Sequence, residues 1–174
     1  MDSAIVAVRK SVVARIEGLR SSLSIQEFTL TGSYAQWDLD LSKTEAAELD
    51  ECDMLRVDVV THGSLQQLAM SSRGTVSYSI PVDIMIRRRF GQDKQNDDTG
   101  KIEVSEIDKL MFLFEQIHLM FTQQRLADSQ LTVWDGEGGG TKPLWTPNIE
   151  HLKQWRQFSA LLRVFFRVDM KLVT

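Results

Sequence analysis

The side chains best suited to catalytic or metal chemistry are few and scattered along the chain. The sequence has three histidines, His62, His118 and His151, and one cysteine, Cys52. No two histidines have the short helical spacing of a metal-binding pair, and a zinc site requires three or four ligands. Cys52 lies among acidic residues, which disfavour the thiolate form that attacks or binds metal. The sequence therefore predicts no metal site and no cysteine nucleophile.

Two loops have the composition of ion-binding or phosphate-binding segments but lack the required order of residues. Gly136–Gly140 is rich in glycine, but Thr141 and Lys142 follow it in the reverse of the order that a phosphate loop needs. The polar loop Gly91–Gly100 holds three aspartates, whose positions do not match those of a calcium-binding loop. We therefore predict no catalytic residue and no bound cofactor, and we expect that the protein is not an enzyme.

A run of three arginines is a local concentration of positive charge. Arg87, Arg88 and Arg89 end an alternating segment, so Arg87 and Arg89 share its polar side while Arg88 points the other way. Arg163 and Arg167 lie on the polar side of the last alternating segment. If these two segments pair, the arginines form a basic strip along one face of a sheet.

An acidic segment elsewhere in the chain complements that strip. Glu45, Glu48, Asp50 and Glu51 lie within the range 43–53, which we interpret as a short surface helix or loop. Two interpretations of these charges stay open. In one, they are solvated surface residues. In the other, the arginines contact an acidic partner surface, which can be the acidic segment of another copy of the chain. The second interpretation predicts an interface formed by Glu45, Glu48, Asp50, Glu51, Arg87, Arg89, Arg163 and Arg167.

Composition narrows the class of protein further. The 174 residues are 43% hydrophobic and 25% charged, which excludes a mostly disordered chain. Twenty basic and 24 acidic residues give a net charge of −4, which argues against a nucleic-acid binder that works by overall attraction. No apolar run has the length of a membrane span, and the first residues do not resemble a secretory signal. Length predicts a single domain over residues 1–174.

The elements that must position these residues follow from hydrophobic periodicity. Helical spacing predicts helices over Ile5–Leu19 and Ser105–Gln124, the first capped by Asp2 or Ser3. Alternation predicts strands, two of them unusually long. The predicted strands cover 25–31, 37–41, 54–60, 76–89, 131–134 and 158–172. We expect a polar loop over 64–74 and a helical turn opening at Thr146–Pro147. Pro81 lies inside a long strand, which predicts that this strand is at an edge or bulged there.

The order of these elements predicts an α+β fold. It has a mostly antiparallel sheet with long strands and two main helices packed on one face. This pattern resembles the tail terminator and related tail-completion, or neck, proteins of long-tailed bacteriophages. The likeness is carried by Ile5–Leu19, Val76–Arg89, Ser105–Gln124 and Phe158–Met170. The stretch 72–90 also looks like uncharacterised phage tail-region proteins.

The resemblance implies a structural role in the virion, with assembly in the host cytoplasm. Proteins of this family form a homo-oligomeric ring, usually of six copies, at the head-proximal end of the tail tube. The expected partners are the tail tube protein and a head-completion or connector protein, with DNA passing through the lumen and no membrane. Two alternatives stay open. One is another head–tail connector or a small α+β module that binds a protein through a free strand edge. The other is an enzyme with an unrecognised site.

Overall fold

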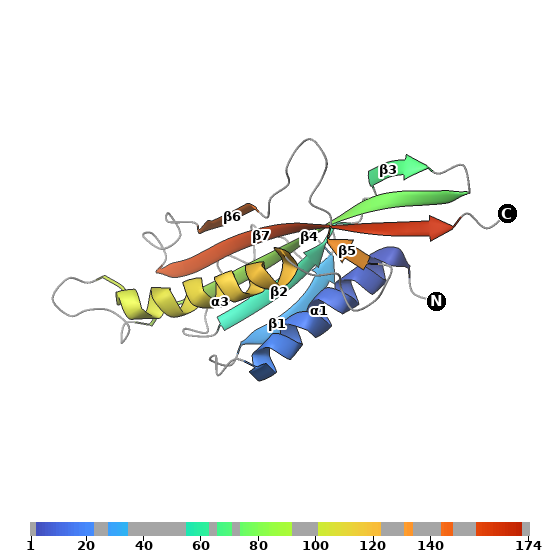
Figure 1. Ribbon diagram of the computed structural model, residues 1–174. Helices are drawn as coiled ribbons and strands as arrows, with labels where there is room; N and C mark the ends of the chain where they lie inside the picture. The colour runs from blue at the N-terminus through green and yellow to red at the C-terminus, as the bar shows by residue number, and fades with distance from the viewer. Residues whose placement is uncertain are drawn as a thin grey trace.

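The computed structural model describes residues 3–22, 28–34, 55–62, 66–70, 74–91, 101–122, 131–133, 144–147 and 156–171. Within these residues there are two helices and one seven-stranded sheet (Figure 1). The helices are α1 (Ala4–Ser22) and α3 (Val104–Thr122). The strands are β1 (Thr29–Tyr34), β2 (Leu55–Thr61), β3 (Gln66–Met70), β4 (Thr75–Arg89), β5 (Leu131–Val133), β6 (Leu144–Pro147) and β7 (Gln157–Lys171). Neither described helix is long and apolar enough to cross a membrane.

Strands β4 and β7 form the long central ribbon of the sheet. They pair antiparallel over all 15 positions, from Thr75 opposite Lys171 to Arg89 opposite Gln157. Even-numbered apolar side chains of both strands lie on one face because strand residues alternate between faces. Those on β4, from Ile80 to Ile86, pair with those on β7, from Phe166 to Ala160, and all of them are buried. The predicted long strands are therefore confirmed.

The remaining strands lie along the two edges of this ribbon. The order is β1-β2-β4-β7-β5, with β3 beside β4 and β6 beside β7. Every described pairing is antiparallel except that of β1 with β2, which is parallel. The α+β fold with a mostly antiparallel sheet is thus confirmed, and the sheet is mixed. The predicted strand over 37–41 lies outside the described residues.

Three local predictions were wrong, each for a reason of pairing. The predicted polar loop over 64–74 contains β3, and Thr146–Pro147, expected to open a helical turn, ends β6. The residues that would continue this turn lie outside the described ones. Pro81 is not in an edge strand, because β4 has neighbours on both sides. Its carbonyl accepts a hydrogen bond from the His62 backbone N–H, between the paired ranges of β2 and β3. The missing N–H of Pro81 therefore falls at the junction of two short neighbours.

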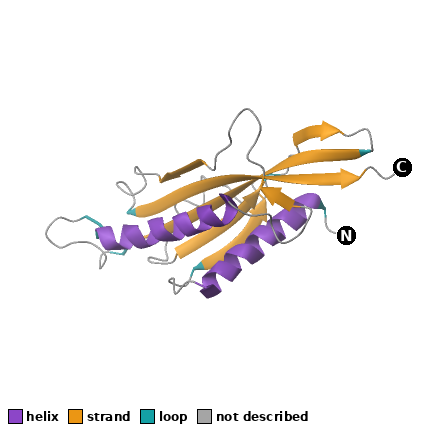
Figure 2. Ribbon diagram, in the orientation of Figure 1, coloured by secondary structure: helices purple, strands orange, loops and turns teal. Residues whose placement is uncertain are grey.

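Both helices cover the same face of the sheet, which we call the helix face (Figure 2). Val8, Val12 and Ile16 form the fully buried stripe of α1, within the predicted helix. Ser3 caps this helix, because its Oγ accepts from the Val6 backbone N–H at 3.4 Å. α3 packs over β7, where the rings of Phe121 and Phe166 meet edge to face at 6.0 Å. The opposite face of the sheet carries the odd-numbered side chains of β4 and β7, because strand residues alternate between faces.

Candidate functional site

The sheet face opposite the helices, which we call the polar face, is built from the odd positions of β4 and β7 and the even positions of β2. In the middle of this face, register places one charged pair between two apolar pairs. Met85 lies opposite Leu161, Asp83 opposite Arg163, and Pro81 opposite Phe165. The charged residues of the polar face that form ion pairs with one another are Arg56, Asp58, Asp83, Arg87, Arg163, Arg167 and Asp169.

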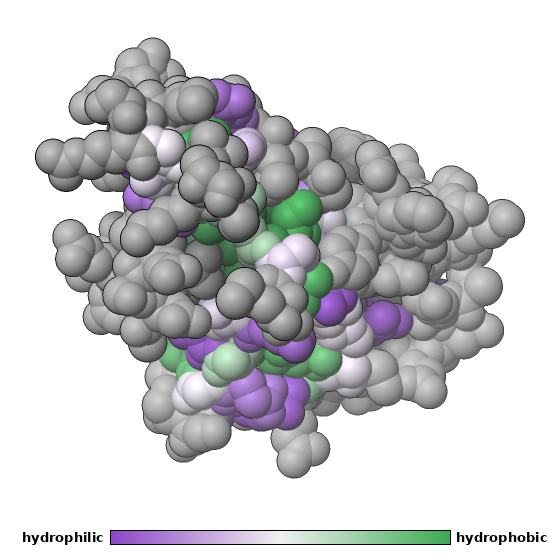
Figure 3. All heavy atoms as spheres, turned by 90° about the vertical axis from the view of Figure 1, so that its right-hand side faces the viewer, coloured by the Kyte–Doolittle hydropathy of each residue, from purple (hydrophilic) through white to green (hydrophobic). Residues whose placement is uncertain are grey.

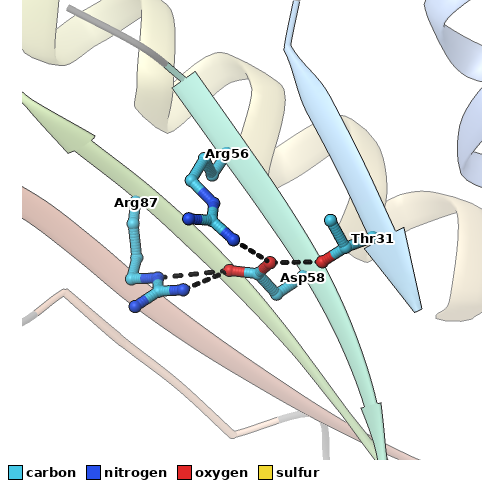
Figure 4. A network of polar contacts seen from close by, with 4 residues as sticks. All are labelled: Thr31, Arg56, Asp58 and Arg87. Atoms are coloured by element: carbon cyan, nitrogen blue, oxygen red, sulfur yellow. Dashed lines mark hydrogen bonds and ion pairs between the residues drawn. The ribbon is translucent and has the colours of Figure 1, made fainter. Parts of the chain in front are cut away.

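A buried cluster around Asp58 lies at one end of the polar face (Figure 4). Arg87 donates from Nε and Nη2 to Asp58 Oδ2, at 3.2 and 2.6 Å. Arg56 Nη2 lies 3.6 Å from Asp58 Oδ1, which also accepts a hydrogen bond from the Thr31 hydroxyl. Arg87 is 5% exposed and Asp58 2%. Arg87 therefore lies on the predicted polar side but is not solvated, because a buried carboxylate holds it inside the protein.

A second cluster around Asp83 lies in the middle of the polar face. Arg163 donates from Nε to Asp83 Oδ1 at 2.6 Å and from Nη2 to Asp83 Oδ2 at 2.8 Å. His62 Nε2 lies 2.8 Å from the same Oδ2. Burial by itself raises the pKa of Asp83, but the hydrogen bonds and positive charges of Arg163 and His62 outweigh it and leave that pKa below its ordinary value. The bidentate contact also raises the pKa of Arg163.

A third cluster lies at the other end of the ribbon and is more exposed. Ser77 donates to Asp169 Oδ1, and Arg167 reaches both residues, Asp169 Oδ1 at 3.2 Å and Ser77 Oγ at 3.0 Å. The Ser77 hydrogen bond lowers the pKa of Asp169 more than burial raises it, and Arg167 lowers it further. The side chains of Arg167 and Asp169 are 44% and 53% exposed. This end of the polar face therefore presents charge to the surroundings.

The predicted basic residues share one face, but they do not form a basic strip. Arg87, Arg163 and Arg167 each contact an aspartate, so the strip is a ladder of ion pairs. Arg89 is half-buried and lies opposite Gln157. The acidic part of the predicted interface, Glu45, Glu48, Asp50 and Glu51, lies outside the described residues. The interface itself stays a prediction.

Sequence reasoning placed Arg88 on the opposite side from Arg87 but missed its partner. Arg88 is 2% exposed on the helix face, and its Nη1 donates to Glu106 Oε2 at 3.0 Å. Lys109 also donates to Glu106, at 2.6 Å. The available signal was an arginine in an otherwise apolar register, because a buried guanidinium requires a carboxylate or other acceptors.

Apolar side chains are exposed on both sides of the molecule. On α3 they are Val104, Phe112 and Leu119, and on β7 they are Leu161 and Met170. Figure 3 views the side on which β7 ends, and hydrophobic and hydrophilic side chains lie next to each other there. Among the described residues, no group of three or more histidines, cysteines and acids is arranged to hold a metal ion.

No protein-family model matches this chain, and no curated protein is significantly similar to it.

Proposed function

We propose that this chain is a structural subunit of a long-tailed bacteriophage virion, a tail terminator or neck protein. It assembles with copies of itself into a ring that caps the tail tube and joins it to the head. The ring has six copies, its neighbours are the tail tube protein and a head-completion or connector protein, and DNA passes through its lumen. The element order and the α+β fold support this proposal.

The observation that carries the proposal is the polar face of the β4–β7 ribbon. The ribbon has 15 continuous pairs, and in the middle of its polar face the ion pair Asp83–Arg163 lies between the apolar pairs Met85–Leu161 and Pro81–Phe165. Leu161, at 37% exposed, lies on this face next to Arg163, whose side chain is 40% exposed. A ring requires two different patches on each subunit that contact each other and close by rotation. The polar face supplies one such patch, with apolar contact area and directional charges.

Native mass spectrometry over a range of protein and salt concentrations tests the proposal. We expect a discrete closed species, and we expect Leu161→Asp to weaken it because a carboxylate would be buried without a partner. Leu119→Asp is the matched control, since Leu119 is exposed on α3 on the opposite side of the molecule. The same variants are then offered purified tail tubes that lack their cap.

The outcomes separate the proposal from its alternatives. A ring, or capping of tubes, that is lost with Leu161→Asp and retained with Leu119→Asp supports the polar face as an assembly surface. If Leu161→Asp leaves the ring intact, the polar face is not part of the contact between subunits. A monomer at every concentration that also ignores tail tubes contradicts the phage proposal and favours a monomeric binding module.

A further inference from the structure

The side of α3 that faces away from the sheet carries a line of exposed residues. Their positions are spaced alternately by three and four residues, which places them on one side of the helix. We call these residues the outer stripe; they are Ser105, Asp108, Phe112, Glu115 and Leu119. Phe112 is 46% exposed and Leu119 is 51% exposed. The exposed side of α3 is therefore partly apolar.

The outer stripe follows a seven-residue repeat. Phe112 and Leu119 are seven positions apart, and so are Asp108 and Glu115. Alternating spacings of three and four are those by which one α-helix packs along another. At a rise of ~1.5 Å per residue, the two acids are about 10 Å apart along the helix axis. The outer stripe thus has the spacing of a helix-pairing surface on which apolar and acidic residues alternate.

The two acids of the outer stripe have no basic partner in the part of the chain that the structure describes. Neither Asp108 nor Glu115 forms an ion pair or side-chain hydrogen bond there. The third acid of α3, Glu106, is buried and contacts both Arg88 and Lys109. Lys109 therefore does not neutralise the outer stripe, although it belongs to the same helix. Two exposed carboxylates beside Phe112 remain available to a partner.

The positions of these carboxylates argue against a second copy of α3 as the occupant. In a parallel pair of helices, each acid would meet its own counterpart. In an antiparallel pair centred on Phe112, Asp108 of one copy would meet Glu115 of the other. Like charges that meet across a contact disfavour it. The same carboxylates repel an anionic lipid surface and a nucleic-acid strand.

We propose that the outer stripe binds an amphipathic helix of a partner protein, in which apolar and basic residues alternate with the same seven-residue repeat. Its apolar residues contact Phe112 and Leu119, and its lysines or arginines contact Asp108 and Glu115. The acids thus attract the partner and prevent self-pairing, which are the two components of specificity. The outer stripe lies on the opposite side of the molecule from the polar face, so this binding does not require the proposed ring.

A fluorescein-labelled peptide of three heptads tests the proposal by fluorescence anisotropy. It has leucine and lysine alternating at the two pairing positions of each heptad, and alanine and glutamine elsewhere. We expect saturable binding that weakens as salt rises, because the paired charges are exposed. Glu115→Lys is expected to weaken binding about fivefold, since it replaces attraction by repulsion. Glu103→Lys is the control, because Glu103 is exposed, precedes α3 and gives the same change in net charge.

Two further changes examine the apolar contacts and the spacing. Phe112→Ser is expected to weaken binding about tenfold, because the ring no longer buries apolar area. A peptide of the same composition, with its leucines and lysines shuffled out of the repeat, is expected to bind at least about tenfold more weakly. Thermal unfolding verifies that each protein variant is folded.

Several outcomes of these titrations overturn the proposal. They are the absence of binding, equal binding of the shuffled peptide, and equal losses with Glu115→Lys and Glu103→Lys. Tighter binding to phosphatidylserine vesicles than to the peptide also overturns it. So does self-association of the unmodified protein that is lost with Phe112→Ser, because a second copy would then be the occupant.

A second experiment tests the outer stripe without a peptide. The combined substitution Asp108→Leu and Glu115→Leu removes the repelling charges, and we expect it to add a dimer contact that sedimentation velocity detects. Glu103→Leu is the control. Association of the stripe variant that does not exceed that of the unmodified protein, or that Glu103→Leu reproduces, overturns the proposal. Neither experiment uses the polar face, so failure here is distinguishable from failure to form a ring.

Discussion

Two adjacent arginines of β4 occupy opposite faces of the sheet, and each is held by a carboxylate from a different element. Arg87 contacts Asp58 of β2 on the polar face, and Arg88 contacts Glu106 of α3 on the helix face. Removing a buried charge from water costs several kcal/mol, and the partner carboxylate offsets that cost only while both members are present. The position of α3 against the sheet therefore depends on the Arg88–Glu106 pair, and the register of β2 against β4 depends on the Arg87–Asp58 pair.

Removing one member of the helix-face pair is expected to destabilise the protein strongly. Glu106→Ala leaves Arg88 buried without its carboxylate, and we expect the free energy of unfolding to fall by about 3 kcal/mol. Adding Arg88→Met to that variant is expected to recover most of the loss, because no uncompensated charge remains. Lys109→Ala is the control, since the Lys109 side chain is 63% exposed and its contact with Glu106 contributes little. Urea unfolding measures all three, and a double variant as unstable as Glu106→Ala contradicts the explanation.

The Asp83 cluster predicts a loss of stability in acid. The pKa of Asp83 is lower in the folded protein than its ordinary value of 3.8, so the unfolded chain binds the proton more readily. Its contribution is complete above pH of about 4 and disappears as pH falls through the lower pKa of the folded state. We expect the unfolding midpoint in urea to fall less steeply below that pH in Asp83→Asn than in the unmodified protein. Equal slopes would show that Asp83 is not responsible.

At the residue scale, alternation predicted the side on which each arginine lies but not its burial. The same period-two pattern that placed Arg87 opposite Arg88 is compatible with a solvated polar face and with a buried one. Burial of Arg87 depends on Asp58, which is 29 residues earlier in the chain and meets it only after β2 and β4 pair. Sequence periodicity is local, so it predicts the face and not the partner.

At the scale of elements, the long amphipathic patterns were predicted best, although the three-residue strand β5 was also predicted, over 131–134. α1, α3, β4 and β7 have long periodic patterns, and each was predicted at nearly its observed position. β3 and β6 have only five and four residues, and they are strands because the long ribbon offers them an edge. The parallel pairing of β1 with β2 likewise has no local signal. It requires a long connection, which residues 35–54 supply.

The packing of α1 against β1 is expected to depend on one glycine. A Cβ at Gly32 would lie 3.1 Å from Val13 Cγ2, whereas a Cβ at Gly18 would meet no atom within 4 Å. We expect Gly32→Val to destabilise the protein by about 1–2 kcal/mol, because helix and strand must separate. Gly18→Ala is expected to stabilise it by about 0.5–1 kcal/mol, because alanine favours helix. Thermal and urea unfolding test both, and a neutral Gly32→Val would show that α1 shifts without cost.

At the scale of the whole molecule, the two sheet faces have different roles. The helix face is closed by α1 and α3 and contains the apolar core. The polar face carries ion pairs that are satisfied within the chain, yet several of their members and Leu161 remain partly exposed. Charges that are already paired keep a fixed geometry, which suits recognition of a complementary surface. The proposed ring therefore depends on which positions along the ribbon carry positive and negative charges, as well as on the presence of these charges.

A charge swap at the exposed end of the ribbon separates stability from assembly. The combined substitution Arg167→Asp and Asp169→Arg preserves one positive and one negative charge, and the Ser77 hydroxyl can donate to one group and accept from the other. We expect the free energy of unfolding to change by less than about 0.5 kcal/mol, as for most surface substitutions. A partner surface, however, would meet reversed charges, and we expect the assembled species to dissociate at about tenfold higher protein concentration.

Sedimentation velocity over a concentration series measures this shift. Lys101→Glu is the control, because Lys101 precedes α3, whose Glu106 contacts Arg88 at the opposite end of the ribbon from Asp169. Loss of assembly with unchanged unfolding assigns the effect to recognition between subunits. Loss of both assigns it to the fold of the ribbon itself, since β4 and β7 are paired to their ends at this position. Assembly that is unchanged by the swap places the subunit contact elsewhere and removes the Arg167–Asp169 end of the polar face from the proposed ring interface.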